Sequence, residues 1–318
     1  MGHELARSSY TRVVTELDGE LVPASLRKTI PEWAGDEGTR WLNGLPATIA
    51  RLQDQWGLTV EGHLKGGFCS LVLRVRSTSM GPTVLKVPFP DRESRLEHAA
   101  LVAYAGDGAV VAHAFDYTSR AMLLERVAPG ESLGATLPLS QAVEVAGKLL
   151  GRLRRTPPPG VSFDSTLTTL RSWAHRFREA SNLLSVRWPD LPLMQAAEFA
   201  DQLCATTSPD WLVNRDAHLD NFLRSEREPW LLIDPKPMVG DPACDGGFLA
   251  LDVMKRIPNC SNQIVSDLLW QLSECLGCSF TDLRSWALIR AVDNVGWAEE
   301  VGADQETWVN RALALAGL

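Results

Sequence analysis

The sequence predicts an α+β protein of two lobes, with a β-containing N-terminal lobe and a mainly helical C-terminal lobe. Three observations lead to this prediction. Short runs rich in Val and Leu, separated by polar and Gly-containing stretches, precede residue 125 and are typical of strands. After residue 130 the apolar residues instead recur at helical spacing, apart from one β-rich island at residues 211–234. The chain of 318 residues is long enough for one large domain or two packed lobes.

In the N-terminal lobe we expect, in order, a helix at residues 32–56, strands at 71–75 and 83–87, a helix at 92–104 and strands around 110–111 and 122–124. Trp41, Leu45 and Ile49 recur at helical spacing within the first segment. The second helical segment is rich in Ala, Leu and Glu and is followed by Gly106, a residue type that often ends helices.

In the C-terminal lobe we expect helices at residues 140–153, 167–184 and 193–203, then the β-rich island at 211–234, then helices to the end. The first of these helices is followed by Pro157-Pro158-Pro159-Gly160, which cannot continue it. We therefore predict a nucleotide-binding N-terminal lobe with its preceding helix at residues 1–124, a hinge at 125–130, and a helical lobe with the catalytic loop and acceptor site at 131–318.

The composition is that of an ordinary globular protein, with 45% hydrophobic and 22% charged residues. The 39 Asp and Glu residues outnumber the 31 Lys and Arg residues, and the formal net charge is −8. An acidic chain repels polyanions, so we expect no nucleic-acid partner and consider a cationic small molecule more plausible. No apolar run reaches the roughly 18 residues of a membrane span. The first residues lack the pattern of a secretion signal, so a cytoplasmic location is expected.

The β-rich island carries the residues that indicate chemistry. Asp216 is followed five positions later by Asn221, which is the spacing of a kinase catalytic loop. Asp234 comes thirteen positions after Asn221 at the end of an apolar run, a distance that suits a hairpin returning the chain to the same edge. In phosphoryl transfer, the first Asp orients the attacking hydroxyl and takes its proton, while the Asn and the second Asp hold Mg²⁺ against the phosphates.

The other parts of a phosphotransferase occur in the order that such an enzyme needs. Gly66-Gly67-Phe68-Cys69-Ser70 precedes a strand and is a candidate phosphate-covering turn. Lys86 lies within an apolar strand, where an unpaired ammonium would be costly. Glu97 in the next helix is its candidate partner, with Glu93 as the alternative. Residues 124–127 lie where a connector between lobes would offer backbone groups to adenine. Each feature is common by itself, and their joint order is the signal.

These residues, together with longer stretches around them, identify a family resemblance. The chain resembles the aminoglycoside phosphotransferases, in particular the group that phosphorylates streptomycin at its 6-hydroxyl or phosphorylates hydroxyurea. Residues 226–242, which read E-R-E-P-W-L-L-I-D-P-K-P-M-V-G-D-P, are similar to the signature that follows the catalytic loop in that group. Residues 35–46, 105–110 and 122–126 also match, and the resemblance covers most of the chain from about residue 30. It implies a protein-kinase-like fold.

The resemblance also implies roles at the matching positions. Asp216 would be the catalytic base, and Asn221 and Asp234 the magnesium ligands. The cofactors would be ATP or GTP with Mg²⁺. The nucleotide contacts would come from Ser70 in the phosphate loop, from Lys86 held by Glu97, and from the connector between Glu125 and Val127. The implied activity is phosphorylation of a hydroxyl of a streptomycin-like antibiotic, which gives resistance by inactivating it.

The chain departs from the family's usual pattern around the acceptor. Asn214 stands where the loop usually begins with His, Asp220 replaces a common Gly, and Gly246-Gly247 follow Asp245 where apolar or aromatic residues are usual. Aminoglycosides are hydroxyl-rich polycations, so carboxylates are expected around them. The candidates for acceptor binding are Asp220, Asp241, Asp245, Asp252, Asp293, Glu299 and Glu300. Asp241 and Asp245 would equally suit the start of a helix.

Two alternatives to the antibiotic kinase remain open. The same fold could act on a hydroxyl of another natural product, a biosynthetic intermediate or a metabolite, or the chain could be a nucleotide-binding pseudokinase. The second is disfavoured because the chain retains the residues that pseudokinases often lose, Lys86, Asp216, Asn221 and Asp234. Protein substrates are disfavoured because residues 240–242 follow Asp234 too closely for an activation segment. A P-loop enzyme is excluded because no G-x-x-x-x-G-K-[ST] motif occurs.

Overall fold

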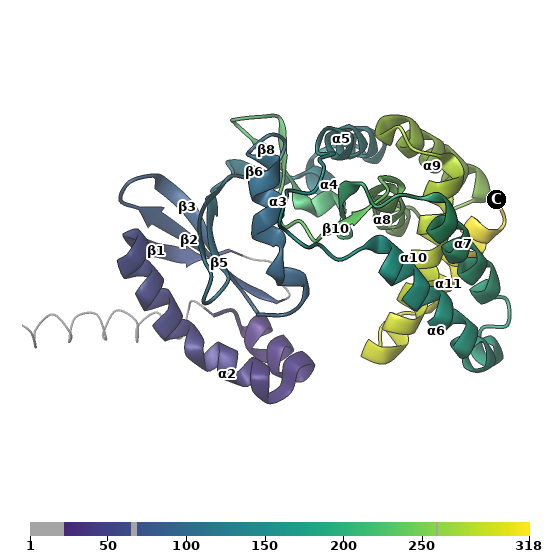
Figure 1. The fold of residues 1–318 in the computed structure, drawn as a ribbon, viewed down its shortest axis with the longest axis horizontal. Coiled ribbons are helices and arrows are strands. Elements are labelled where there is room, and N and C mark those ends of the chain that lie inside the picture. The colour runs from purple at the N-terminus through teal and green to yellow at the C-terminus, as the bar shows by residue number, and fades with distance from the viewer. Residues whose placement is uncertain (1–21, 65–68, 259) are drawn as a thin grey trace, which may run out of the picture. The chain divides into compact units, whose positions relative to one another are not determined.

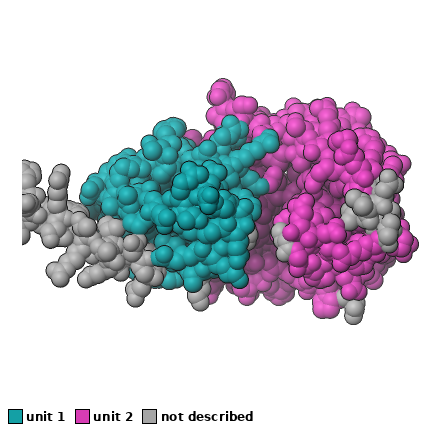
Figure 2. Space-filling model, turned by 90° about the horizontal axis from the view of Figure 1, so that it is seen from below, with its two compact units in different colours: residues 1–98, 110–126 teal, residues 99–109, 127–318 magenta. Residues whose placement is uncertain are grey.

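The computed structural model describes residues 22–64, 69–258 and 260–318. The chain divides into two compact units (Figure 2). Unit 1 takes residues up to 98 together with 110–126, and unit 2 takes residues 99–109 and 127–318. Unit 1 contains most of the sheet structure and unit 2 most of the helices (Figure 1). No helix in the described ranges combines the length and apolar character needed to cross a membrane.

Unit 1 is built on a five-stranded antiparallel sheet with the order β1-β2-β3-β5-β4. Its strands are β1 (Leu58–His63), β2 (Ser70–Ser77), β3 (Gly81–Pro88), β4 (Ala112–Asp116) and β5 (Ala121–Glu125). The predicted strands at 71–75, 83–87 and 122–124 are confirmed as β2, β3 and β5. The edge strand β1 was not expected, and only Leu58 of its residues is buried.

The first helix, α2 (Ala24–Trp56), packs along one face of this sheet (Figure 1). Its buried residues recur at helical spacing and include Leu45, Ile49 and Leu52, which join one apolar cluster with Leu71 and Leu85 of the strands. The predicted helix at 32–56 is therefore confirmed and starts eight residues earlier than expected. Gly35 has a φ of 55° and marks a kink within it.

Strand β3 separates two kinds of side chain by simple alternation. Leu85 and Val87 belong to the cluster under α2, so Lys86 between them points to the opposite face of the sheet. On that strand Lys86 lies opposite Val72 of β2 and Met122 of β5, in the middle of the sheet. Its side chain is 6% exposed, and the strand therefore holds an ammonium group in a buried environment.

Two secondary-structure predictions in this region are corrected. The expected helix at 92–104 is a short 3₁₀ turn, η1 (Glu93–Arg95), followed by α3 (Glu97–Tyr104). Asp91 caps the turn, because its Oδ1 accepts the N–H of Ser94 at 2.7 Å, and Leu96 then leaves helical geometry. The strand expected at 110–111 is wrong as well. β4 begins at Ala112, one residue after the expected strand ends.

An ion pair within unit 1 predicts a pH-dependent stability. Arg51 of α2 donates to both carboxylate oxygens of Asp116, at 2.9 and 2.7 Å. This hydrogen bonding from Arg51 outweighs the opposing effect of burial and holds the pKa of Asp116 well below its ordinary value of 3.8. We expect Arg51→Met to destabilise the fold by about 1 kcal/mol at neutral pH, because the arginine is partly exposed.

The sign of this effect follows from the lowered pKa in the folded state. The ionised carboxylate stabilises the fold above the unfolded pKa of 3.8, and this contribution is lost as the pH falls below it. Thermal melts of wild type and Arg51→Met should therefore differ most at pH 7, and the difference should begin to shrink as the pH falls below about 4. Arg40→Met is the matched control, since Arg40 lies on the same helix and donates to the carbonyl of Asp36 one turn earlier. A gap that stays constant with pH would contradict the assignment.

Unit 2 contains the helices of the second half of the chain. They are α4 (Leu133–Thr136), α5 (Leu139–Arg152), α6 (Thr166–Arg187), α7 (Leu193–Thr206), α8 (Ala243–Lys255), α9 (Asn262–Leu276), α10 (Phe280–Val301) and α11 (Glu306–Ala316). Helix α10 packs against α7, α8 and α11, while α5 packs against α9 (Figure 1). The helices predicted at 140–153, 167–184 and 193–203 are confirmed as α5, α6 and α7.

The unusual pair Gly246-Gly247 allows α8 to approach α10 closely. A Cβ on Gly247 would lie 2.6 Å from the Cβ of Trp286 and 2.9 Å from the backbone N of Ala287. A Cβ on Gly246 would lie 2.6 Å from a methyl group of Leu283. The departure from the family pattern at these positions is therefore explained by helix packing.

The β-rich island forms two small sheets within unit 2. Strands β8 (Phe222–Ser225) and β9 (Trp230–Leu232) form the expected hairpin, which is joined by β6 (Pro129–Ser132). Strand β7 (Trp211–Asn214) pairs with β10 (Pro237–Gly240), so that Asn214 lies opposite Pro237. The chain segments before Asp216 and after Asp234 are thereby held side by side.

Candidate active site

Asn214 organises the start of the loop that carries Asp216. It ends β7, and its side chain is buried. Its Oδ1 accepts the N–H of Asp216 at 3.1 Å and the N–H of Lys236 at 2.8 Å. The loop is thus tied to the segment just after Asp234. Asn214, which stands where the family usually has His, thus bonds backbone N–H groups on both segments.

Two carboxylates of α8 accept hydrogen bonds from the backbone of the same loop. Asp245 accepts the backbone N–H of Asn214, and Asp252 accepts the backbone N–H of Leu219 at 2.9 Å. Asp245 is fully enclosed, and burial raises its pKa to about 8 in spite of the hydrogen bond from Asn214. Asp245 is therefore buried beneath the loop and stabilises it. Its carboxylate is shielded from the solvent through which an acceptor would enter.

Asp216 itself presents its carboxylate to solvent from a fixed backbone. Its side chain is 42% exposed, with His218 Nε2 at 3.8 Å from Oδ2. Its backbone carbonyl accepts Nδ2 of Asn221 at 3.2 Å. The carboxylate lines a pocket of about 370 Å³, together with Phe248, Lys255 and Arg290. An acceptor hydroxyl entering this pocket would find a carboxylate in position to take its proton.

The β8–β9 hairpin brings Asn221 and Asp234 to the same end. Asn221 immediately precedes β8 in the 3₁₀ turn η2 (Leu219–Asn221), and Asp234 follows β9 by two residues. The carbonyl of Asn221 accepts the N–H of Ile233 at 2.9 Å. Asp234 adopts a φ of 49°, which is uncommon for a non-glycine residue. Lys236 Nζ lies 3.6 Å from Asp234 Oδ1.

The donor set at this end of the hairpin fits a magnesium ion. Asn221 uses its Nδ2 toward Asp216, so its Oδ1 points the other way. An amide oxygen and a carboxylate are hard oxygen ligands, and Mg²⁺ in phosphotransferases takes few protein ligands because phosphates and water supply the others. No cluster of three or more His, Cys, Asp or Glu suited to a metal occurs among the residues that the structure describes.

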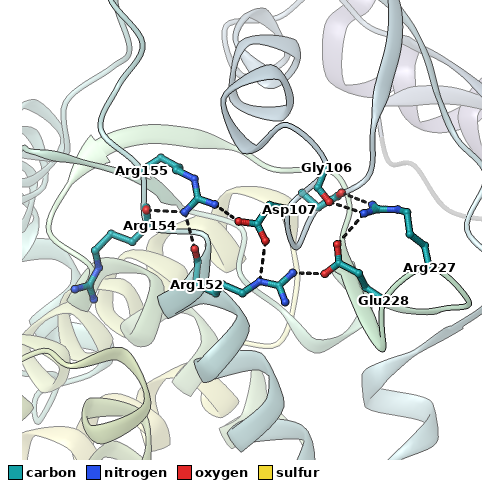
Figure 3. Close-up of polar contacts among 8 residues, drawn as sticks. Gly106, Asp107, Arg152, Arg154, Arg155, Arg227 and Glu228 are labelled. Atoms are coloured by element: carbon teal, nitrogen blue, oxygen red, sulfur yellow. Dashed lines mark hydrogen bonds and ion pairs between the residues drawn. The ribbon is translucent and has the colours of Figure 1, made fainter.

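The tip of the same hairpin is anchored within unit 2 (Figure 3). Arg227 donates to the carbonyls of Gly106 and Ala109, at 2.6 and 2.9 Å. Glu228 next to it accepts from Arg227 at 2.7 Å and from Arg152 at the end of α5. These contacts use the E-R-E-P-W part of the signature. They restrain the hairpin whose other end carries Asn221 and Asp234.

In unit 1 the structure joins Lys86 to Glu97. Lys86 Nζ lies 2.7 Å from each carboxylate oxygen of Glu97, and the two side chains are 6% and 2% exposed. Glu93, the alternative partner, lies in the turn η1 before the helix. A buried ammonium on the far face of the sheet from α2, held by a carboxylate, suits an anionic ligand such as a nucleotide phosphate.

The remaining candidates for nucleotide binding have simpler surroundings. Ser70 begins β2 opposite Pro88, and residues 65–68, including Gly66 and Gly67, lie outside the described residues. Glu125 exchanges hydrogen bonds with Val111, since its N–H donates to the Val111 carbonyl at 2.8 Å and its Oε2 accepts the Val111 N–H at 3.0 Å. Val127 is the first residue of the second segment of unit 2 and is partly buried.

Two of the carboxylates expected to bind the acceptor serve local structure. Asp220 is 2.8 Å from Arg256 Nη2 and accepts Ser132 Oγ at 3.1 Å. Burial opposes ionisation of Asp220, but Arg256 holds its pKa below the ordinary value. Asp241 accepts the N–H of Ala243 at 2.8 Å at the start of α8, as expected for a residue that caps a helix.

Two more of the candidate carboxylates, Asp293 and Glu299 on α10, are paired with arginines. Asp293 is 9% exposed and accepts from both Arg176 and Arg290. Glu299 lies 3.3 Å from Arg187. Asp245 and Asp252 accept backbone N–H groups of the loop, so six of the seven carboxylates predicted to bind the acceptor have partners within the chain, and the seventh, Glu300, lines the pocket of about 250 Å³ described next.

Sequence analysis missed the basic and aromatic residues that line the site. A second pocket of about 250 Å³ shares Arg215, Phe248, Arg290 and Trp297 with the one beside Asp216, so the two adjoin. Trp286, Arg290, Asp293 and Trp297 follow one another at intervals of four, three and four residues on α10. This spacing places them on one helix face. This pattern of aromatic and charged residues on one helix face could have indicated from the sequence that α10 lines the site.

Comparison with known proteins agrees with this geometry. The family described as "Aminoglycoside/hydroxyurea antibiotic resistance kinase" matches residues 55–302. A streptomycin 6-kinase from Streptomyces griseus is 32% identical over 92% of this chain and 97% of its own length. A hydroxyurea phosphotransferase from Kitasatospora aureofaciens is 33% identical over 91% of this chain and 82% of its own.

Solved structures with this fold are more distant in sequence. A choline/ethanolamine kinase family protein from Mesorhizobium loti superposes with a TM-score of 0.58 at 17% identity, covering 85% of this chain and 94% of that one. An ethanolamine kinase from Plasmodium vivax gives 0.55 at 13% identity, covering 96% and 93%. These structures confirm the predicted protein-kinase-like α+β fold.

Proposed function

Because the chain belongs to the aminoglycoside/hydroxyurea antibiotic resistance kinase family, we propose that it transfers phosphate from ATP to a hydroxyl group of a streptomycin-like aminoglycoside. Phosphorylation would inactivate the antibiotic and give resistance. The observation that carries this proposal is the arrangement of Asp216, Asn221 and Asp234, which one loop and one hairpin bring together beside a pocket large enough for part of such an acceptor.

The roles of the residues follow from their contacts. Asp216 orients the acceptor hydroxyl and accepts its proton as the new P–O bond forms. Asn214 and Asp245 keep the loop in place for this step. Asn221 and Asp234 would hold Mg²⁺. When bound there, the ion would supply charge neutralisation at the phosphate oxygens.

Nucleotide binding is assigned to residues of the N-terminal half. Lys86, oriented by Glu97, would bind the α- and β-phosphates. Ser70 would donate to the phosphates, and the backbone between Glu125 and Val127 would meet the base. Among the relatives of known structure, a spectinomycin phosphotransferase, at 14% identity, was solved with ADP and spectinomycin. ATP is the expected donor, and GTP is the alternative to test.

The direct test is a coupled assay of nucleotide consumption with Mg²⁺ and ATP. The acceptors would be streptomycin, other aminoglycosides, hydroxyurea and unrelated hydroxylated antibiotics, with mass spectrometry to identify a phosphorylated product. A mass increase of one phosphate group on streptomycin or a close relative is expected. Nucleotide binding without turnover of any acceptor in the panel would overturn the assignment of the acceptor and favour another natural-product or metabolite hydroxyl.

A further inference from the structure

The strongest unexplained feature near the site is a carboxylate shared by two arginines. Arg176 of α6 donates to Oδ1 of Asp293 at 2.5 Å, and Arg290 donates to Oδ2 of the same side chain. Both oxygens of this buried carboxylate are therefore engaged, and two positive charges share one negative charge. Each guanidinium has five N–H donors, so both retain donors beyond those that Asp293 accepts.

This cluster lies in the wall of the pocket of about 250 Å³ that adjoins the one beside Asp216. Three arginines, Arg176, Arg215 and Arg290, line this pocket with two carboxylates, Asp293 and Glu300. The pocket beside Asp216 has the same balance. Its charged lining consists of the cations Arg215, Lys255 and Arg290 and the carboxylates Asp216 and Asp252, with His218 in addition. Arg215 and Arg290 belong to both linings, so the joined site holds four cations and four carboxylates, and the two shared arginines lie where the compartments meet.

Aromatic side chains fix the position of Arg290. Its guanidinium lies 5.2 Å from the ring centre of Phe248 and 6.0 Å from that of Trp173. Both rings belong to the same pocket. Cation–π contacts of this kind orient a guanidinium that also keeps an ion pair. Arg290 is therefore a preorganised donor.

A second observation points to an oxygen-bearing ligand. Trp286 lines the same pocket, its side chain is 1% exposed, and its Nε1–H has no acceptor among the described residues. An indole N–H can only donate, and a buried donor without an acceptor is unfavourable. Three groups of this lining, the guanidinium groups of Arg176 and Arg290 and the indole N–H of Trp286, are therefore hydrogen-bond donors only.

We propose that Arg176, Arg290 and Trp286 form an acceptor subsite that binds hydroxyl, carbonyl or carboxylate oxygens and disfavours ammonium and guanidinium groups. The inference rests on the proposed function and refines it. An aminoglycoside would enter with its hydroxyl-bearing side against α10 and its cationic groups directed away from this wall. Arg176 and Arg290 would then determine which acceptors are preferred, without taking part in the transfer step.

The test compares a polycationic and a neutral acceptor. Streptomycin and hydroxyurea would be assayed with wild type, Arg176→Gln and Arg290→Gln, and the ratio of their kcat/KM values measured. Each variant removes one positive charge near the acceptor, so the ratio should shift toward streptomycin by about five- to tenfold. The shift should shrink at high salt, because mobile ions screen partly exposed charges. Arg290→Lys keeps the charge and should leave the ratio near that of wild type.

Arg178→Gln is the matched control. Arg178 lies on the same helix as Arg176, pairs with Asp201 and is absent from the pocket lining. Thermal melts would show whether Arg290→Gln remains folded, and Arg176→Gln provides an independent variant because its side chain is 53% exposed. An unchanged ratio in the folded pocket variants, or an equal shift in Arg178→Gln, would overturn the subsite.

A measurement without turnover separates this inference from the proposed function. Trp297 lines both compartments and is 51% exposed. Its fluorescence, obtained by subtracting the signal of Trp297→Phe, should show a higher ratio of iodide to caesium quenching than N-acetyltryptophanamide shows in solution. Arg290→Gln should reduce that ratio, and Arg178→Gln should not. If wild type phosphorylates neither acceptor, the proposed function fails while the quenching still decides the charge of the wall. A ratio no higher than that of N-acetyltryptophanamide would overturn the inference.

Discussion

Asp216→Asn is expected to lower kcat by about 10²–10⁴-fold, because the amide cannot accept the proton of the acceptor hydroxyl. The loop should keep its shape. Its contacts at this residue use the backbone, with the N–H donated to Asn214 and the carbonyl accepting Asn221. Steady-state kinetics would measure the loss, and titration calorimetry should show nearly unchanged affinity for the nucleotide.

The control for this variant is Asp210→Asn, which changes an exposed aspartate just before β7 in the same way. It should retain wild-type turnover and melting temperature. If Asp216→Asn kept turnover within about tenfold of wild type, Asp216 would not be the base, since a positioned general base contributes more than that. A large loss of nucleotide affinity would instead indicate that the substitution disturbs the loop.

Asp234→Asn should weaken binding of magnesium–nucleotide by about 10–100-fold, a range typical when groups at metal sites are changed. The substitution removes the negative charge of one of the two proposed protein ligands, a carboxylate that also lies 3.6 Å from Lys236 Nζ. Asn is preferred to Ala here, because it tolerates the φ of 49° that the backbone adopts at this position. The fold should therefore survive the change.

Titration calorimetry with ATP, in the presence of magnesium and after its removal by a chelator, would measure this effect. The difference between the two conditions should be large for wild type and small for Asp234→Asn. Equal magnesium dependence in both proteins would contradict the assignment of Asp234 as a ligand. Asp210→Asn again serves as the control for loss of a surface carboxylate.

The two predicted halves of the site differ in how well local patterns describe them. Lys86 and Glu97 are 11 positions apart, and their pairing was predicted from a lysine in an apolar strand and a glutamate in the next helix along the chain. The acceptor region depends on more distant partners. Carboxylates are predicted to bind the acceptor there, and in the structure Asp220 and Asp293 are paired with arginines, while Asp245 accepts a hydrogen bond from the backbone of the loop.

Long-range packing explains this difference. Arg176 and Asp293 are separated by 117 positions and meet only because α6 and α10 lie in one helical assembly. The charge of a carboxylate in a pocket depends on such partners, which no local pattern encodes. Similarly, glycine is unfavourable within a helix, so the local sequence does not explain the pair 246–247. The close contact between Gly247 and Trp286 explains it.

The sequence by itself determined the family, the protein-kinase-like α+β fold and the positions proposed for phosphoryl transfer. These depend on periodicity and on short spacings such as that from Asp216 to Asn221, which are properties of consecutive residues. The charges around the proposed acceptor site depend instead on contacts between helices that are distant in the chain. Arg290 and Trp286 of α10 line the pocket, and Gly247 of α8 lets the two helices pack closely at Trp286. This packing is stabilised by contacts between residues that are far apart in the chain.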